Sequence, residues 1–133
     1  KESYWRDAVA EYAKRLSRFC KWEVRELPER RSPEEEAESI LKECRGYIVA
    51  LAVEGKICSS EQLAAKLKQL CDAGKEITFV IGSSCGLAPR VKQAADELLS
   101  FSPMTFPHQM MRVILSEQVY RAFMINAGAE YHK

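Results

Sequence analysis

Apolar residues recur three or four positions apart in several segments of the chain, a spacing typical of helices with one buried face. Two of these segments begin with a capping box, Ser32-Pro-Glu-Glu35 and Ser59-Ser-Glu-Gln62, in which side chains bind the first backbone N–H groups. Ser3 is a candidate N-cap of the first helix. Gly128 is a candidate C-terminal cap of the last one. The predicted helices cover about residues 3–19, 33–44, 60–73, 89–97 and 107–127.

Shorter apolar runs separate these helices. Residues 47–53 and 76–81 suit strands that are buried on both faces of a parallel sheet. Gly55-Lys56 is expected to turn the chain after the first of them. Alternation predicts a further strand at residues 22–27, and a short strand is expected at 98–101. Because strands and helices alternate, the sequence predicts an α/β fold with a mostly parallel sheet and helices on both faces.

Bulk properties limit the class of protein. A length of 133 residues is that of one domain, and we expect residues 1–133 to form it. No run approaches the roughly 20 apolar residues of a membrane span. The five cysteines are scattered singly, which favours reduced thiols over a disulfide framework or a zinc site. Net charge is only +1, and the basic excess lies in residues 1–31, so an RNA footprint would be local. A solvated helix face of mixed charge explains these basic residues equally well.

The segment after the last predicted strand is stiff. Pro103 and Pro107 lack backbone donors and restrict their neighbours, while Ser102 and Thr105 bring hydroxyl groups into the loop. If the strands are parallel and adjacent, three strand ends near Leu51, Gly82 and Phe101 face one crevice, where open α/β sheets bind ligands.

The loop at Gly82-Ser-Ser-Cys-Gly86 supports no nucleotide-binding motif. It lacks the Gly-Lys-Ser/Thr of a P-loop and the glycine spacing of a dinucleotide fingerprint. A tight turn is the alternative interpretation of this loop, and a small-molecule site remains the hypothesis for the three strand ends together.

Several motifs carry a resemblance to a known family. They are Ser102-Pro-Met-Thr-Phe-Pro-His108, Arg112-Val, Glu117-Gln-Val-Tyr-Arg-Ala122, Phe79-Val-Ile-Gly82, Gly86-Leu87, Gly55-Lys56 with Ser59-Ser-Glu61, and Tyr131-His132-Lys133. This combination covers nearly the whole chain and resembles the RlmH family of bacterial methyltransferases, which belongs to the SPOUT, or trefoil-knot, superfamily. The resemblance implies methylation of ring nitrogen 3 of a pseudouridine in large-subunit ribosomal RNA, with S-adenosylmethionine (SAM) as methyl donor and no metal. It also implies a C-terminal trefoil knot, a cytoplasmic homodimer and the assembled ribosome as substrate.

The resemblance also implies roles for individual residues. Family members bind the cofactor at positions matching Leu51, Gly82, Phe101, Ser102, Pro103, Met104, Thr105 and Phe106. The chain departs from the family pattern at Ala52, Ser83 and Cys85, where side-chain roles are therefore in question. The family begins with a short apolar strand that this sequence does not contain, so we expect natural amino-terminal residues to be missing.

The C-terminal residues are the candidates for contact with the target base. The resemblance points to Arg121 and His132 as catalytic residues and to Tyr131 and Lys133 as RNA-binding residues. His132 is the candidate proton acceptor, although an imide can also lose its proton to solvent. Arg112 faces away from Arg121 and could instead pair with Glu117 or lie at an interface.

The last predicted helix is apolar almost all round, so it needs cover on every side. A second subunit is the expected cover, in agreement with the family. Two alternatives to the favoured activity remain open: a SPOUT ribose 2′-O-methyltransferase, and a ribosome-binding protein without catalysis.

Overall fold

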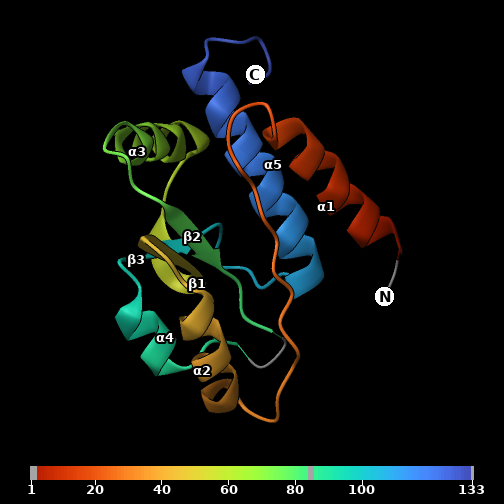
Figure 1. Ribbon diagram of the computed structural model, residues 1–133, viewed down its shortest axis with the longest axis vertical. Helices are drawn as coiled ribbons and strands as arrows, with labels where there is room; N and C mark the ends of the chain where they lie inside the picture. Colours follow the sequence, from red (N-terminus) through yellow and green to blue (C-terminus); the bar gives the residue numbers. More distant parts are fainter. Residues whose placement is uncertain (1–2, 84–85, 133) are drawn as a thin grey trace. The chain divides into compact units, whose positions relative to one another are not determined.

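The structure is a computed structural model that describes residues 3–83 and 86–132. In the described part of the chain, helices and strands alternate, which confirms the α/β prediction. The elements are α1 (Ser3–Leu16), α2 (Pro33–Glu43), β1 (Tyr47–Ile57), α3 (Ser60–Asp72), β2 (Ile77–Val80), α4 (Pro89–Ala94), β3 (Glu97–Ser100) and α5 (His108–Asn126) (Figure 1).

The chain forms two compact units. The first, which we call the helical unit, consists of Lys1–Arg25, Ser59–Gln69 and Gln109–Lys133. The second, the sheet unit, consists of Glu26–Cys58 and Leu70–His108. The cofactor-binding residues implied by the family resemblance belong to the sheet unit, and the predicted catalytic residues belong to the helical unit.

The sheet is parallel, with β1 at its centre and the strand order β2-β1-β3. Val49 lies opposite Phe79 on one side and Glu97 on the other. Asp96 extends the pairing with β3, because its carboxylate accepts from the Ile48 N–H at 2.8 Å and its own N–H donates to the Ile48 carbonyl at 2.8 Å. The predicted strand at residues 22–27 is wrong. A strand needs a ladder partner, and the sheet of the described chain does not include this segment.

The predicted turn at Gly55-Lys56 is also wrong, because β1 continues through it to Ile57. The pairing of β1 with β3 shifts between Leu51 and Lys56, and both residues lie opposite Leu99. A Cβ atom on Gly55 would lie 2.7 Å from the carbonyl carbon of Leu98, so only glycine allows this approach of the two backbones. The glycine therefore marks an irregularity in a strand and not a turn.

One face of the sheet is covered by α2 and α4, which contact each other (Figure 1). The buried cluster joins Ala37 of α2 and Val91 of α4 to Ala50 and Val80 of the two neighbouring strands.

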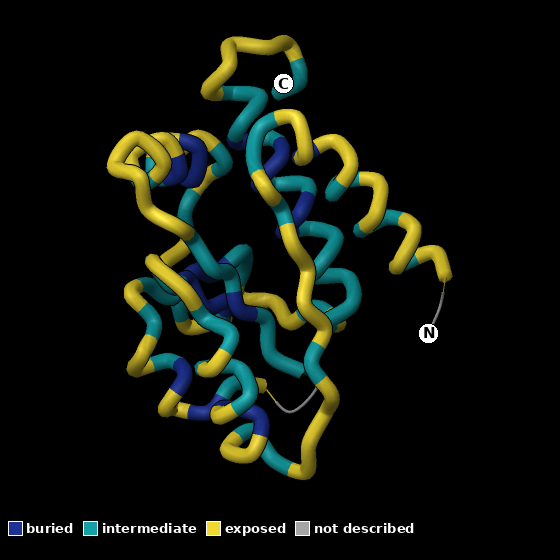
Figure 2. The backbone as a smooth tube through the Cα atoms, in the orientation of Figure 1, coloured by how far each residue is buried: buried dark blue, intermediate teal, exposed yellow. Residues whose placement is uncertain are grey.

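The helical unit is held by aromatic contacts that join α1 and the segment after it to α5. Phe19 stacks on Phe123 with ring centroids 5.3 Å apart, and it meets the edge of Tyr120 at 6.2 Å. Tyr12 contacts the same tyrosine. Figure 2 shows buried positions in the middle of α5, where Val119 is 2% exposed.

The helix caps follow the sequence prediction in most cases. Ser59 and Gln62 form a complete capping box, with hydrogen bonds of 3.0 and 2.8 Å in the two directions. Ser32 accepts from the Glu35 N–H. The Glu35 carboxylate, however, accepts from the N–H of Arg31, whereas a capping box requires the N–H of Ser32.

The first and last helices differ from the prediction at their ends. Ser3 is itself helical and therefore not a cap, and α1 ends at Leu16, before the predicted residue 19. Gly128 has φ +73°, and hydrogen bonds from it and from Ala129 back into α5 complete the predicted cap. No helix in the described ranges is long and apolar enough to cross a membrane.

Replacing Gly55 by alanine tests the close approach of β1 to β3. We expect Gly55→Ala to lower the free energy of unfolding by about 1–3 kcal/mol, because the new methyl group would overlap backbone atoms that have little room to move. Val53→Ala is the matched control: its side chain is 52% exposed in the same irregular segment, and a change of about 0.5 kcal/mol or less is expected. Urea unfolding measures both. Equal stability of the two variants would contradict the close approach.

Candidate functional site

Leu51 of β1 and the carboxyl ends of β2 and β3 lie side by side in the sheet, whereas β1 itself continues to Ile57. Leu51 pairs with Leu99, and the preceding residue of β1, Ala50, pairs with Val80. Gly82 follows β2 by two residues, and Phe101 follows β3 directly. The three predicted positions are therefore adjacent, although Leu51 is not the end of its strand, and we call Leu51, Gly82 and the loop 101–106 the sheet edge.

Serine hydroxyls fix the start of the loop 101–106. The Ser100 side chain is 1% exposed; its Oγ donates to the Ser102 carbonyl at 3.0 Å and accepts from the Ser102 N–H at 3.2 Å. The Ser102 Oγ accepts in turn from the Met104 N–H at 3.0 Å. The two prolines restrict the same loop. The loop is thus rigid without regular secondary structure.

The rest of this loop is open to solvent. Pro103, Met104 and Thr105 are exposed, with Met104 at 70%, while Phe101 and Phe106 are partly buried. No side chain of residues 101–106 carries a charge. Aromatic rings, a hydroxyl and exposed backbone beside a buried strand end suit a flat heteroaromatic group such as adenine. The sheet edge therefore fits SAM, which would be held largely by backbone groups.

The glycine loop after β2 is compact. A Cβ atom on Gly82 would lie 2.9 Å from the carbonyl carbon of Gly86, so the loop closes on itself here. Ser83, one of the departures from the family pattern, donates from Oγ to Glu36 at 2.9 Å. The Glu36 side chain is buried, and it also accepts from the Arg30 N–H at 3.1 Å. Ser83 thus ties the loop to α2, while Cys85 lies outside the described residues.

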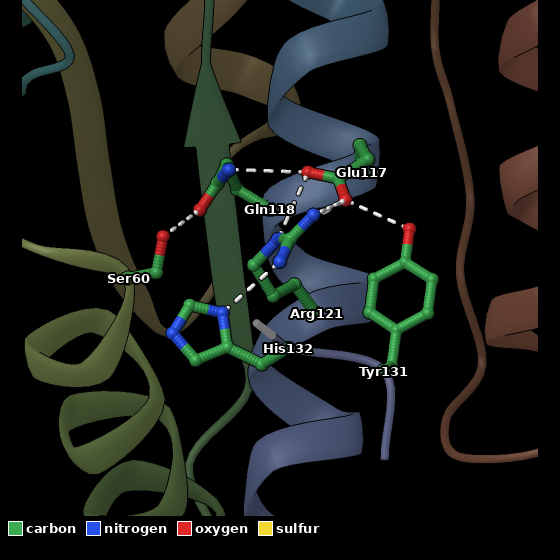
Figure 3. A network of polar contacts seen from close by, with 6 residues as sticks. All are labelled: Ser60, Glu117, Gln118, Arg121, Tyr131 and His132. Carbon is green, nitrogen blue, oxygen red and sulfur yellow. Dashed lines mark hydrogen bonds and ion pairs between the residues drawn. The ribbon is translucent and has the colours of Figure 1, made fainter. Parts of the chain in front are cut away.

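A polar cluster on α5 and the C-terminal tail is the second site, and it lies within the helical unit (Figure 3). The Glu117 carboxylate accepts from Arg121 at 2.7 and 3.1 Å, from the Tyr131 hydroxyl at 2.8 Å and from the Gln118 amide at 3.1 Å. The Glu117 side chain is 18% exposed and that of Arg121 is 24% exposed. One carboxylate therefore organises the two predicted residues Arg121 and Tyr131.

This environment holds two groups in their protonated forms. Burial and the hydrogen bond to Glu117 raise the pKa of Tyr131 well above its ordinary value. The hydrogen bond to Glu117 also raises the pKa of Arg121. The guanidinium carbon of Arg121 lies 4.9 Å from the centre of the Tyr131 ring, so one face of that ring is already covered. Tyr131 is thus a hydrogen-bond donor and no proton acceptor, and a base that stacks on it must use its other face or displace Arg121.

His132 has partners on both ring nitrogens. Its Nδ1 lies 3.0 Å from the Arg121 Nη1, and its Nε2 lies 2.6 Å from the Glu61 Oε2. A guanidinium can only donate, so Nδ1 accepts and the ring proton is on Nε2, which donates to Glu61. The predicted role of His132 as proton acceptor stays a prediction. In this arrangement its free electron pair is already bound by Arg121, so the contact must open before the ring can take a proton.

Sequence reasoning missed Glu117 and Glu61 as parts of this cluster. The signal for Glu117 was available, because an acid four residues before Arg121 on a helix is placed to pair with it. The sequence suggested Arg112 as a partner of Glu117; the structure instead pairs Glu117 with Arg121, and Arg112 donates to Gln109. Lys133 lies outside the described residues. In the part of the chain that the structure describes, no group of three or more His, Cys, Asp or Glu residues could hold a metal ion.

Comparison with known proteins agrees with the resemblance. Residues 1–132 match the model of a family described as "Predicted SPOUT methyltransferase". Three relatives carry the name "Ribosomal RNA large subunit methyltransferase H". The protein of Levilactobacillus brevis is 50% identical to this chain, that of Bifidobacterium adolescentis 51%, and that of a strain of Streptococcus thermophilus 47%. Each comparison covers 100% of this chain and 93% of the relative.

Removing the charge of Glu117 tests its influence on Tyr131. We expect Glu117→Gln to lower the pKa of Tyr131, because the carboxylate disfavours the phenolate, while burial keeps part of the upward shift. Carbon NMR titration of labelled tyrosine measures this, with Tyr131→Phe to assign the signal among five tyrosines. Glu34→Gln removes an exposed glutamate of α2 and is the control. An unchanged Tyr131 titration in Glu117→Gln would contradict the described contact.

Proposed function

We propose that this chain, which belongs to the SPOUT methyltransferase family, methylates ring nitrogen 3 of a pseudouridine in large-subunit ribosomal RNA. The observation that carries the proposal is identity of about half of all residues, along the full chain, to proteins named as large-subunit ribosomal RNA methyltransferases. The sheet edge and the C-terminal polar cluster supply residues suited to the two substrates.

SAM is the methyl donor of this family, and we assign it to the sheet edge. When bound there, it supplies a methyl group that is already electrophilic. The protein therefore needs mainly to position the two reactants and has little need to activate the methyl group. Leu51 and Phe101 offer apolar contact, Gly82 keeps its loop tight, and the rigid backbone of residues 102–106 offers hydrogen-bonding groups. Correct placement of the two reactants can contribute about 7–11 kcal/mol to lowering the barrier.

The C-terminal cluster is assigned to the target base. Arg121 carries a fixed positive charge that can stabilise negative charge on the imide oxygens of the base as its nitrogen loses a proton. His132 is the proton acceptor once Arg121 turns from it to the base, a step worth about 10²–10⁴-fold in rate if it is required. Tyr131 and Lys133 are assigned to RNA contact, with Tyr131 stacking on a base.

The assembly is part of the proposal. We infer that residues 1–133 form one methyltransferase domain that acts as a homodimer in the cytoplasm, with the ribosome as substrate. Support for the dimer comes from apolar side chains of α5 that the single chain leaves partly exposed, among them Val113, Ile114 and Met124. A small domain with net charge +1 has little surface for holding naked RNA, which favours a structured ribosomal target.

A bulky residue at position 105 tests the cofactor site. Thr105 is exposed in the loop of the sheet edge, so Thr105→Trp is expected to fold normally and to abolish SAM binding by filling the space for the ligand. Calorimetric titration with SAM measures the affinity. Arg121→Ala, which alters the other unit, is expected to keep SAM affinity and lose methyl transfer. Unchanged affinity in Thr105→Trp would place the cofactor elsewhere.

Transfer of labelled methyl groups from SAM tests the reaction itself. Ribosomes and naked ribosomal RNA that lack the modification are compared side by side, and the labelled nucleoside is identified after digestion. Label recovered as 3-methylpseudouridine, with ribosomes preferred, is the expected result. Label in a ribose 2′-O-methyl group would indicate the alternative SPOUT activity. Binding to ribosomes without label or SAM affinity would leave a non-catalytic binding protein.

A further inference from the structure

The C-terminal tail contacts the start of α3, a segment far from it in the sequence. His132 donates from Nε2 to the carboxylate of Glu61 at 2.6 Å. Glu61 lies in the first turn of α3, inside the capping box Ser59–Gln62 that begins this helix. Nothing in the motif pattern at the two positions predicts that they meet, since they are 71 residues apart.

The start of α3 is a fixed support within the helical unit. Ser60 donates to the Gln118 side chain at 2.6 Å, and Asn126 donates to the Ala64 carbonyl at 3.0 Å, so α3 is tied to α5 at two points. Neither bond involves Glu61. These bonds fix the backbone from which Glu61 projects, and removal of the Glu61 carboxylate leaves them intact.

The contact is suited to orientation more than to stability. The Glu61 side chain is 64% exposed and that of His132 is 26% exposed, and an exposed pair of this kind contributes little to folding. Its geometric effect is larger. The N–H on Nε2 is directed at Glu61, and the electron pair on Nδ1 is directed at Arg121. One acceptor, Glu61, and one donor, Arg121, therefore define both the tautomer and the plane of the ring.

The charges around Glu61 favour the ionised acceptor. The hydrogen bond from His132 lowers the pKa of Glu61, and a backbone hydrogen bond acts in the same direction. The first turn of a helix also favours a carboxylate. Glu61 therefore remains an acceptor for the ring N–H in neutral solution.

We propose that Glu61 is a positioning residue for His132: it fixes the ring with its proton on Nε2 and directs Nδ1 toward Arg121 and the target base. This inference rests on the proposed methyl transfer, in which His132 is the proton acceptor. It adds the beginning of α3 to the apparatus that serves the RNA substrate, and it assigns no contact between Glu61 and the substrate.

The test combines ring-nitrogen NMR with methyl transfer to ribosomes. The chain has only two histidines, so the nitrogen signals of His132 are assigned directly, and His108 is an internal reference. The variants are Glu61→Ala, which removes the acceptor, and Glu61→Gln, whose amide oxygen can still accept from Nε2. Glu34→Ala, an exposed glutamate in the first turn of α2, is the matched control for loss of one charge.

We expect wild type and Glu61→Gln to show the Nε2–H form. In Glu61→Ala only the Arg121 contact still favours this form, so we expect a shifted Nε2 signal and a smaller share of the Nε2–H tautomer. Methyl transfer by Glu61→Ala is expected to fall about 10-fold with SAM affinity unchanged, as removing a partner that orients a histidine does elsewhere, and Glu61→Gln is expected to recover most of the loss. Glu34→Ala is expected to match wild type in both measurements.

The outcomes separate this inference from the proposed function. A Glu61→Ala protein with an unchanged His132 spectrum, or with a changed spectrum and full activity, overturns the positioning role. A fall in activity that Glu61→Gln does not recover overturns it as well. If wild type transfers no methyl group, the proposed function fails first, and the positioning role for this reaction fails with it; the spectra then report only whether the contact exists.

Discussion

Parallel pairing of β1 with both neighbouring strands is the constraint on which the sheet unit depends. Parallel strands end at the same edge, so pairing Leu51 with Leu99 and Ala50 with Val80 brings three chain segments together there. The segments after β2 and β3 leave the sheet as loops, each with its own means of rigidity, while β1 continues as a strand to Ile57. Hydroxyl groups and prolines fix the loop 101–106, and the loop at Gly82 packs against its own backbone. A site built this way needs few charged side chains, because the pairing of the strands fixes the position of the backbone groups that it presents.

The helical unit achieves rigidity by a different interaction. There a single carboxylate, Glu117, accepts from Arg121, Tyr131 and Gln118, and it thereby ties the C-terminal tail to α5. Because the cluster satisfies its own charges, the proposed roles of Arg121 and His132 require both residues to exchange partners. In the proposed reaction the substrate must therefore compete with these contacts.

Much of the secondary structure could be predicted because its signals are local. The capping box at Ser59 and Gln62 involves residues three apart, and both of its hydrogen bonds are present. The failures have non-local causes. Residues 22–27 alternate like a strand, but a strand exists only with a partner, and the sequence pattern does not contain that information. Gly55 was interpreted as a turn because glycine often marks one. Here its missing side chain instead accommodates the backbone at Leu98, which lies 43 residues later.

The sequence by itself determined the α/β class, most of the helix caps, the stiff loop after β3 and, through its motifs, the family of the chain. It also named Arg121, Tyr131 and His132, but only as separate candidates. The tertiary structure decided which residues meet. Helical spacing could indicate that Glu117 pairs with Arg121, whereas the contact of His132 with Glu61 depends on how α3 and the tail pack on α5. Local patterns encode interactions over a few residues, and a contact across 71 residues is fixed only by the folding of everything between them.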